Sequence, residues 1–504
     1  MLSGDERGTG RPAAIRSAAA RPLAAPGNRR WYALGLLCLA FFIDTFGSTT
    51  VFPAGPAMER ALGLSQAGLQ WSFTAATLPG GALLLAGGRL SDVFGRRRMF
   101  MLGLALLILA SLACGWAPST GVLLGARAAQ GISAALLVPA ALSLVTNTFR
   151  REKERNKALA AWSAVGGAGA TAGLLLGGLV TVSLGWQWIF FINVPLGGAM
   201  LLLSPVLLRE PPVSEGARSV DVPGTVTITC GVALFIYAIT ETSQAGWLNL
   251  RTLSELCLVV ALIAAFARIE SRRKVPMLPP GLLRSRPLVA GNLFLLTAGL
   301  SVDGMVFTLT LYTQRVLGYS AIEFGAITAI MTASSIAGAP IAQRAIARFG
   351  LRLVGRAGLA MLCLSNLGLA ATAWLGGSPI AIAGCMLVFG LGMGCAFVSG
   401  TIASLKDVAE QDSGLAAGIQ NISFSLGTTL GVAILSAISA AVIHSSQPGD
   451  RGSTGVLISG YRAAFICGAL LGALGLAVSA AIYRTRPHEA ATEVSPTDSA
   501  QSRR

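Results

Sequence analysis

Long stretches without a charged residue alternate with short, mostly basic segments along the 504 residues of the chain. The uncharged stretches cover residues 61–88, 99–126, 128–149, 158–208, 357–405, 413–449 and 463–483. An α-helix needs about 20 apolar residues to cross the hydrocarbon core of a bilayer. The pattern therefore predicts fourteen spanning helices, at residues 31–53, 69–89, 99–117, 120–147, 158–182, 187–208, 221–241, 250–269, 288–312, 320–343, 355–375, 380–402, 414–442 and 461–483.

The composition supports a chain that lies within lipid. Hydrophobic residues make up 53% of it and charged residues only 12%, whereas soluble domains carry about 25% charged residues. So few charges leave most of the surface of a chain of this size apolar. We therefore expect an all-α integral membrane protein that crosses the cell membrane many times, with the lipid bilayer as its surroundings.

The net charge of +16 reflects where the basic residues fall. With both termini placed in the cytoplasm, 32 of the 38 lysines and arginines lie in cytoplasmic segments and five lie outside. This asymmetry follows the positive-inside rule and favours that orientation. The bases form no stripe with interleaved aromatic residues, so we expect no nucleic-acid partner.

The chain contains an internal repeat. "GRLSDVFGRRR" (88–98) follows the second predicted span, and "QRAIARFGLRL" (343–353) follows the tenth. Aligned without gaps, four positions match: Arg89 with Arg344, Phe94 with Phe349, Gly95 with Gly350 and Arg97 with Arg352. Two related halves around a central site are a common transporter plan.

With the seventh and eighth spans as an insert, the repeat divides the chain into two halves of six helices each. We expect a mobile cytoplasmic tail, an N-terminal half, two inserted helices with their loops, a C-terminal half and a second cytoplasmic tail, at residues 1–30, 31–208, 209–287, 288–483 and 484–504.

A glycine-rich stretch, "GGAGATAGLLLGG" (166–178), has two interpretations. Gly167, Gly169 and Ala172 fit the G-x-G-x-x-A fingerprint of a dinucleotide site, which must follow a strand and be followed by an acidic residue. Here the stretch lies in an uncharged run, and the next acidic residue is Glu210. Small residues at three- and four-residue steps instead predict one helix face that packs closely in a membrane: Gly166, Gly169, Gly173 and Gly177.

Three of the charged residues inside predicted spans stand out: Asp44, Arg127 and Asp303. A charge at the centre of a bilayer costs about 2.5–3.5 kcal/mol on insertion scales, so such residues are usually functional. Asp44 and Asp303 lie at similar depths in the first helix of each half. A carboxyl group shielded from water exchanges protons closer to neutral pH. Proton coupling with Arg127 in the same site is one interpretation, and a structural charge pair of Asp44 with Arg127 is the other.

The chain lacks the residues that ATP binding, metal binding and covalent catalysis usually require. None of the four lysines follows a glycine, so the chain has no P-loop of the G-K-[ST] type. It has two histidines, and none of its eight cysteines forms C-x-x-C. We therefore expect no metal site, no catalytic cluster and no cofactor. An enzyme is not expected, and energy must come from a gradient or from a partner protein.

At this point the chain resembles the major facilitator superfamily. The segment "GGRLSDVFGRRR" looks like its loop motif, with matches at Gly88, Asp92, Gly95, Arg96 and Arg97. "LGARAAQGISAA" is similar to its fourth-helix motif R-x-x-Q-G, through Arg127, Gln130 and Gly131. The glycine-rich stretch resembles its fifth-helix antiporter motif, with matches at Gly169, Gly173, Gly177 and Gly178 and a leucine, Leu174, in place of proline.

Further segments resemble the fourteen-helix drug–proton antiporter branch of that superfamily. "GWQWIFFINVPLG" (185–197) is close to its sixth-helix signature, with Gln187 in place of arginine. "FIDTFGSTTVFP" looks like its first-helix pattern, with matches at Asp44 and Pro53. The resemblance implies proton-coupled efflux of small apolar or cationic compounds, such as antibiotics, by alternating access. We expect a monomer whose partners are its small-molecule substrate and protons.

Two alternatives stay open from the residues. A proton-coupled uptake carrier would have the same fold but the opposite direction. A membrane enzyme or sensor would need a catalytic cluster, which the residues do not show. The 88–98 loop fits a transporter, because Asp92 can accept hydrogen bonds from Arg96 or a helix end and so hold the cytoplasmic side closed. The simpler alternative is that the arginines there only anchor the topology.

The topology generates the first prediction. A reporter fused after Arg484 is expected to be cytoplasmic, and one inserted near Gly449 is expected to be external, because the positively charged loops stay inside. Paired alkaline phosphatase and fluorescent protein fusions measure both positions. The reverse pattern would contradict the predicted spans.

Overall fold

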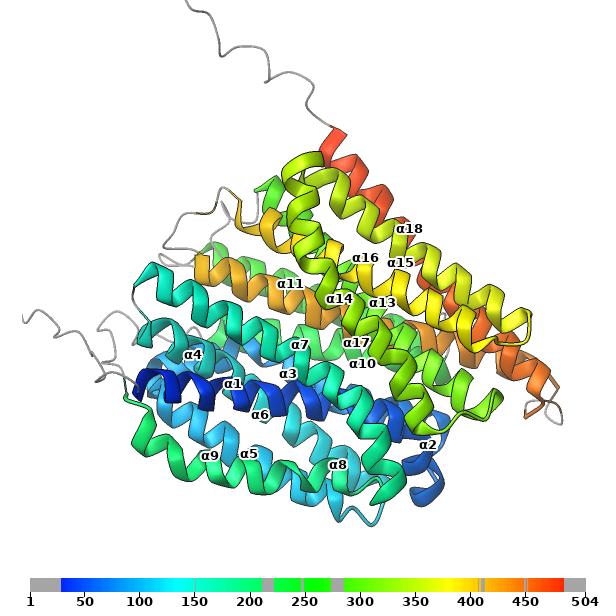
Figure 1. Cartoon of the computed structure of the whole chain (residues 1–504), viewed down its shortest axis with the longest axis horizontal. Coiled ribbons are helices and arrows are strands. Elements are labelled where there is room, and N and C mark those ends of the chain that lie inside the picture. The colour runs from blue at the N-terminus through cyan, green and yellow to red at the C-terminus, as the bar shows by residue number, and fades with distance from the viewer. Residues whose placement is uncertain are drawn as a thin grey trace, which may run out of the picture.

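The computed structural model describes residues 29–149, 151–210, 222–245, 249–272, 285–406, 408, 413–447, 450 and 452–484. Within these residues every regular element is a helix, and the helices form one bundle (Figure 1). Such an arrangement satisfies the backbone hydrogen bonds inside each segment, as a bilayer requires. Of the N-terminal tail that was predicted to be mobile (1–30), residues 1–28 lie outside the described residues, and residues 29 and 30 begin the first helix. The predicted C-terminal tail lies outside the described residues from residue 485 on.

The helices follow the predicted order along the chain, with two groups and, between them, the pair that was predicted to be inserted. The first group contains α1 (Arg29–Thr49), α2 (Val51–Leu62), α3 (Gln66–Ala82), α4 (Leu84–Phe94), α5 (Arg96–Gly115), α6 (Thr120–Thr148), α7 (Glu152–Ser183), α8 (Trp188–Phe191) and α9 (Asn193–Leu207). The inserted pair is α10 (Val222–Ala245) and α11 (Leu250–Ser271). The second group contains α13 (Arg286–Leu311), the π-helix η2 (Tyr312–Val316), α14 (Ala321–Phe349), α15 (Leu351–Trp374), α16 (Pro379–Leu405), α17 (Ser413–Ser445) and α18 (Thr454–Arg484).

The all-α membrane fold is confirmed, whereas the number of fourteen spans stays a prediction. Within the described residues, twelve helices are long and apolar enough to cross a membrane. The predicted span at 69–89 coincides with α3 and α4, which are separated at Leu83. The predicted span at 221–241 coincides with α10, whose described apolar part, Pro223–Ile239, is shorter.

Prolines explain why two predicted spans divide into shorter helices. Pro53 has no N–H to donate to the Thr49 carbonyl, and α1 ends at Thr49 before α2 continues to Leu62. Pro195 likewise leaves the Phe191 carbonyl without its intrahelical donor, at the point where α8 ends. A missing N–H breaks the hydrogen-bond ladder at that turn while the chain keeps its direction.

The glycine-rich stretch lies in α7 and faces α1. A methyl group on Gly169 would lie 2.7 Å from the Phe42 carbonyl oxygen, and one on Gly173 would lie 2.7 Å from that of Phe46. Gly166 leaves room for the Phe41 ring, which stacks on Trp162 at a centroid distance of 4.3 Å. The absence of side chains on this face lets the two backbones approach closely, which is the packing that the helix interpretation predicts. In the part of the chain that the structure describes, no strand precedes this helix, so the stretch lacks the setting that a dinucleotide fingerprint needs.

The second group repeats this contact between α13 and α17. A methyl group on Gly299 would lie 2.4 Å from the Phe424 carbonyl oxygen, and one on Gly304 would lie 2.5 Å from that of Gly431. From the other side, one on Gly427 would lie 2.3 Å from the Leu296 carbonyl oxygen. Each group therefore holds its first helix against a later helix by a contact between backbones.

The repeated loop has the same geometry in both groups. Gly95 separates α4 from α5 with φ 102° and ψ 131°, and Gly350 separates α14 from α15 with φ 84° and ψ 154°. Only glycine adopts this region of backbone conformation without strain. The structure thus supports the relationship between 88–98 and 343–353.

The bundle has two chemically different ends. We call the end where α1 begins and α18 ends the basic end, because most lysines and arginines lie in its connections, and the opposite one the far end (Figure 1). The two groups meet where α7 packs on α14 and α3 on α17. The inserted helix α10 packs beside this second contact, on both α3 and α17. The Thr229 hydroxyl of α10 donates to the Ala82 carbonyl oxygen at 3.1 Å.

The contact between α1 and α7 generates the second prediction. Gly173→Ala is expected to lower the apparent unfolding temperature in detergent by several degrees, because the new methyl group meets the Phe46 carbonyl oxygen and overpacking costs about 1–3 kcal/mol. Gly125→Ala in α6 is the matched control, since its methyl group would meet nothing within 4 Å. There, replacement of a helical glycine is expected to be neutral or stabilising. Equal unfolding temperatures for both variants would contradict the close contact.

Candidate transport site

The two carboxylates predicted inside the membrane lie beside the glycine contacts. Asp44, on α1, is half-buried and precedes Thr45, which packs against Gly169. Asp303, on α13, is half-buried and precedes Gly304, which packs against the backbone of α17. The Asp303 carboxylate interacts with the Thr428 hydroxyl of α17. Each group of helices therefore places one carboxylate next to a close contact between helices.

Arg127 is held by neutral groups in the interior of the first group. Its side chain is on α6, and the residue is only 3% exposed. Its Nε donates to the Ser72 carbonyl oxygen at 3.0 Å, and its Nη1 donates to Gln130 Oε1 at 2.8 Å. The guanidinium also lies over the Phe190 ring, 5.9 Å from its centroid. Buried charges need such hydrogen bonds to offset lost hydration.

Gln130 extends this network to two further helices. Its Nε2 donates to Ser111 Oγ on α5 at 3.0 Å, and Asn193 Nδ2 on α9 donates to the same hydroxyl at 3.3 Å. Gly131 brings α3 close, because a methyl group there would lie 2.0 Å from the Ala76 carbonyl oxygen. Sequence reasoning found Arg127, Gln130 and Gly131 but missed Ser111 and Asn193, since nothing in a single uncharged serine or asparagine marks it as a partner.

The predicted pair of Asp44 with Arg127 is not a contact ion pair. None of the ion pairs found among the described residues joins these two side chains. Asp44 nevertheless lies within electrostatic range of Arg127. Arg127 is therefore held by hydrogen bonds to neutral groups, and it interacts with the Asp44 carboxylate only electrostatically, without a direct contact. This leaves the Asp44 oxygens available to a proton or a cationic ligand.

The predicted latch lies at the basic end, away from the carboxylates. Asp92, near the end of α4, accepts a hydrogen bond from Arg96 Nη2 at 3.0 Å. The backbone N–H of Arg97 donates to Glu210 Oε1 at 3.1 Å, and Arg97 Nη1 donates to the Leu208 carbonyl oxygen at 3.3 Å. Gly88 is on the same helix as Asp92, and a methyl group added to it would lie 3.8 Å from the Pro139 side chain of α6.

Glu210 is the residue of this cluster that sequence reasoning missed. Its carboxylate lies at the N-terminus of α5, where it satisfies a backbone N–H and interacts favourably with the helix dipole. A methyl group on Gly95 would lie 2.9 Å from the same carboxylate, so the glycine also makes room for it. The signal in the sequence is weak, because Glu210 follows the helix that ends at Leu207, far from the motif along the chain.

A family model described as Major Facilitator Superfamily matches residues 37–432 and 292–502. The chain belongs to the major facilitator superfamily. Its fold agrees with a solved bacterial homologue of the human lysosomal transporter Spinster, in an inward-facing and occupied conformation. The TM-score is 0.66 at 16% identity, and the likeness covers 92% of this chain and 98% of the other.

Two curated proteins from Streptomyces have a higher sequence identity to this chain than that structure does. Puromycin resistance protein pur8 of Streptomyces alboniger is 35% identical over 88% of this chain and 90% of its own length. Tetracenomycin C resistance and export protein of Streptomyces glaucescens is 32% identical over 84% of this chain and 77% of its own length. Membership of a family of transporters confirms the prediction that this chain is a multi-pass membrane transporter of small molecules and not an enzyme.

The loop of this facilitator generates the third prediction. Asp92→Asn is expected to insert normally but to transport much less, because the neutral amide no longer holds Arg96 as a charged pair. Ion pairs at the surface contribute only about 0–1 kcal/mol, so the fold should be stable without it. The measurements are membrane abundance and substrate flux in inverted vesicles.

Glu154→Gln is the matched control for this variant. Glu154 pairs with Arg30 at 2.8 Å, and the side chains of both pairs are 22–34% exposed. Reduced flux in Asp92→Asn with normal flux in Glu154→Gln would assign the role to the loop. Wild-type flux in Asp92→Asn would leave the loop with a role in topology alone.

Proposed function

We propose that this chain exports small apolar or cationic compounds, antibiotics among them, in exchange for protons, with both termini in the cytoplasm. The names of the relatives support export: they include resistance and export proteins for puromycin, tetracenomycin C and, in Amycolatopsis lactamdurans, cephamycin. Uptake is not favoured by any of these names. A proton gradient would be the energy source, no cofactor would take part, and the monomer would be the working unit.

The observation that carries the proposal is the pair of half-buried carboxylates, Asp44 and Asp303. They lie on the first helix of each group, in corresponding surroundings beside a glycine contact. An ionisable residue within a membrane bundle is costly and is typical of proton and substrate pathways. A proton and a cationic substrate that bind the same carboxylate compete directly. This competition is the simplest basis for the exchange of substrate for protons.

Contacts at the far end support alternating access between two states. Arg315, on η2, forms an ion pair with Glu59 on α2. Gln314 Nε2 donates to the Pro53 carbonyl oxygen at 3.3 Å. The rings of Phe73 and Phe307 meet edge to face at 5.2 Å. All three contacts join the first group to the second, so they must break before a pathway can open at the far end.

The latch at the basic end is confined to one group. The hydrogen bonds of Asp92 and Arg97 described above all go to residues of the first group. These contacts between the groups at the far end support a state that is closed to the outside. An exporter takes up its substrate in that state.

The fourth prediction tests the coupling. Asp44→Asn keeps the shape and hydrogen-bonding capacity of the side chain but cannot exchange a proton. We expect at least a tenfold loss of efflux driven by an imposed pH gradient, with substrate exchange between equal concentrations partly retained. Proteoliposomes with a fluorescent cationic dye such as ethidium measure both fluxes.

Two further variants make the result specific. Asp303→Asn tests the corresponding carboxylate of the second group. Glu255→Gln is the control, because Glu255 is also an acid within a helix but pairs with Arg251 near the far end, at 3.1 Å. Normal pumping by Asp44→Asn with failure of Asp303→Asn would move the proton site to α13. Normal pumping by both would contradict carboxylate coupling, though the chain would still be a transporter.

A further inference from the structure

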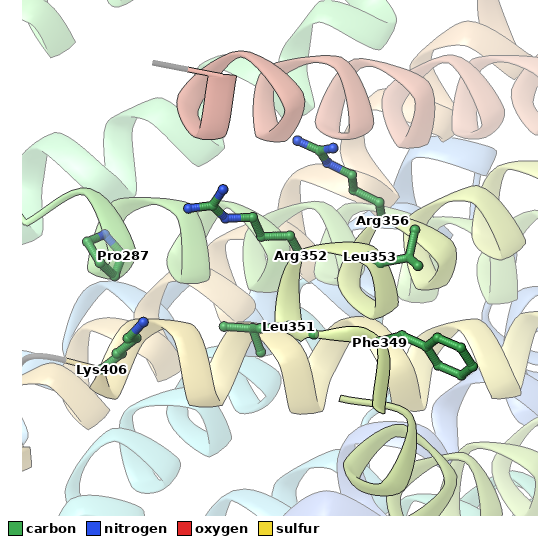
Figure 2. A pocket seen from close by; sticks show the side chains of 8 residues that line it. Pro287, Phe349, Leu351, Arg352, Leu353, Arg356 and Lys406 are labelled. Carbon is green, nitrogen blue, oxygen red and sulfur yellow. The ribbon is translucent and has the colours of Figure 1, made fainter. Parts of the chain in front are cut away.

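A basic cavity lies at the basic end of the second group, apart from the carboxylates. Its volume is about 460 Å³. It lies between the starts of α13 and α15 and the end of α16, and its cationic lining residues are Arg352, Arg356 and Lys406. Figure 2 shows Arg352 and Lys406 on either side of the space next to Pro287, with Arg356 one turn further along α15. Its lining includes no acidic residue among those described.

The first group has a carboxylate at the corresponding place. There Glu210 accepts the N–H of Arg97 at the start of α5, and Arg97 corresponds to Arg352 in the internal repeat. Without gaps, residues 204–212 align with 479–487, with matches of Ser204 to Ser479, Arg209 to Arg484 and Pro212 to Pro487. In this alignment the position of Glu210 holds Thr485. The repeat offset also places Arg356 opposite Met101.

By this alignment the second group has a threonine where the first has an acid, and an arginine where the first has a methionine. The start of α15 adds backbone N–H groups and the positive end of the helix dipole to the same cavity. Arg356 Nη2 donates weakly to the Ala480 carbonyl oxygen at 3.5 Å. Its Nε is buried without a hydrogen-bond partner among the described residues. Guanidinium and ammonium groups in this arrangement are suited to a phosphate.

Apolar side chains beside the cations distinguish a lipid from a free anion. Phe349 and Leu353, which also line the cavity, are each 58% exposed. A free phosphate ion would make no favourable contact with these apolar side chains, whereas the acyl chains of a phospholipid would cover them. In the proposed orientation the cavity lies at the cytoplasmic leaflet, which carries anionic lipids, and basic pockets between helices on that side bind their headgroups.

We propose that this cavity binds the phosphate of an anionic phospholipid, with Arg352, Arg356 and Lys406 as its cationic contacts. The site goes beyond the proposed export function, and its test does not use transport. Lipid binding and export can therefore fail independently.

The fifth prediction is measured by native mass spectrometry of the full-length protein in detergent. The probes are dioleoyl phosphatidylglycerol and dioleoyl phosphatidylcholine at equal concentrations. The wild type is expected to retain phosphatidylglycerol preferentially. Lys406→Gln and Arg356→Met are each expected to weaken this binding roughly fivefold, the equivalent of about 1 kcal/mol per cation near an anionic membrane. Lys406 is exposed, so its variant should fold normally.

Arg98→Gln is the control, because Arg98 is an exposed cation in the corresponding loop of the first group. Unchanged phosphatidylglycerol binding in both cavity variants would overturn the proposal and leave these cations with a topological role. An equal loss in Arg98→Gln would also overturn it, since any surface charge would then suffice. A third arm adds inorganic phosphate alone. In the contrary result, phosphate stabilises the wild-type protein but not Arg356→Met, while the wild type shows no preference for phosphatidylglycerol over phosphatidylcholine. That result would assign the cavity to a free anion and overturn the lipid assignment.

Discussion

The close approach of helix backbones through glycine is the contact on which the rest of the structure depends. Lipid tails are as apolar as leucine side chains, so burial of large apolar groups between helices gains little in a bilayer. Dispersion contacts between closely spaced backbones replace that gain. Gly169 and Gly173 supply them between α7 and α1, and Gly299 and Gly304 supply them between α13 and α17. Each half-buried carboxylate lies one residue from such a contact, so its depth in the bundle follows from the position of the glycines.

The polar side chains of the interior are of two kinds: those held by hydrogen bonds to one another, and a carboxylate outside that network. Arg127 and Gln130 use their hydrogen-bonding capacity on Ser72, Ser111 and each other, and they thereby tie α6 to α3 and α5. Such a network is stable in a low dielectric because its buried donors have partners. Asp44 lies outside this network and only feels its charge. A rigid cation near this carboxylate suits the proton exchange that we propose for Asp44.

The two halves share a backbone plan but differ in charge. Gly95 and Gly350 make the same turn between helices, as the repeat requires. In the first half Glu210 occupies the adjoining helix terminus, whereas arginines and a lysine surround a cavity in the second. The same turn geometry thus occurs twice, and different neighbouring residues give each turn its own chemistry. The ion pair of Glu59 with Arg315 at the far end joins these halves without belonging to either repeat motif.

The sequence by itself determined the class of fold, the approximate helices and the motifs of the family. These depend on hydropathy and spacing over about 20 neighbouring residues, which a chain in lipid must obey wherever it lies in the bundle. The face of α7 that packs was also readable, because its glycines recur at helical steps. Only the tertiary structure decided that Arg127 contacts Ser72 and not Asp44, that Glu210 caps α5, and that Arg315 pairs with Glu59. Those partners are 55, 113 and 256 residues apart. The tilt and rotation of the helices against one another decide which polar side chains meet across such separations. The local sequence pattern does not determine that tilt and rotation.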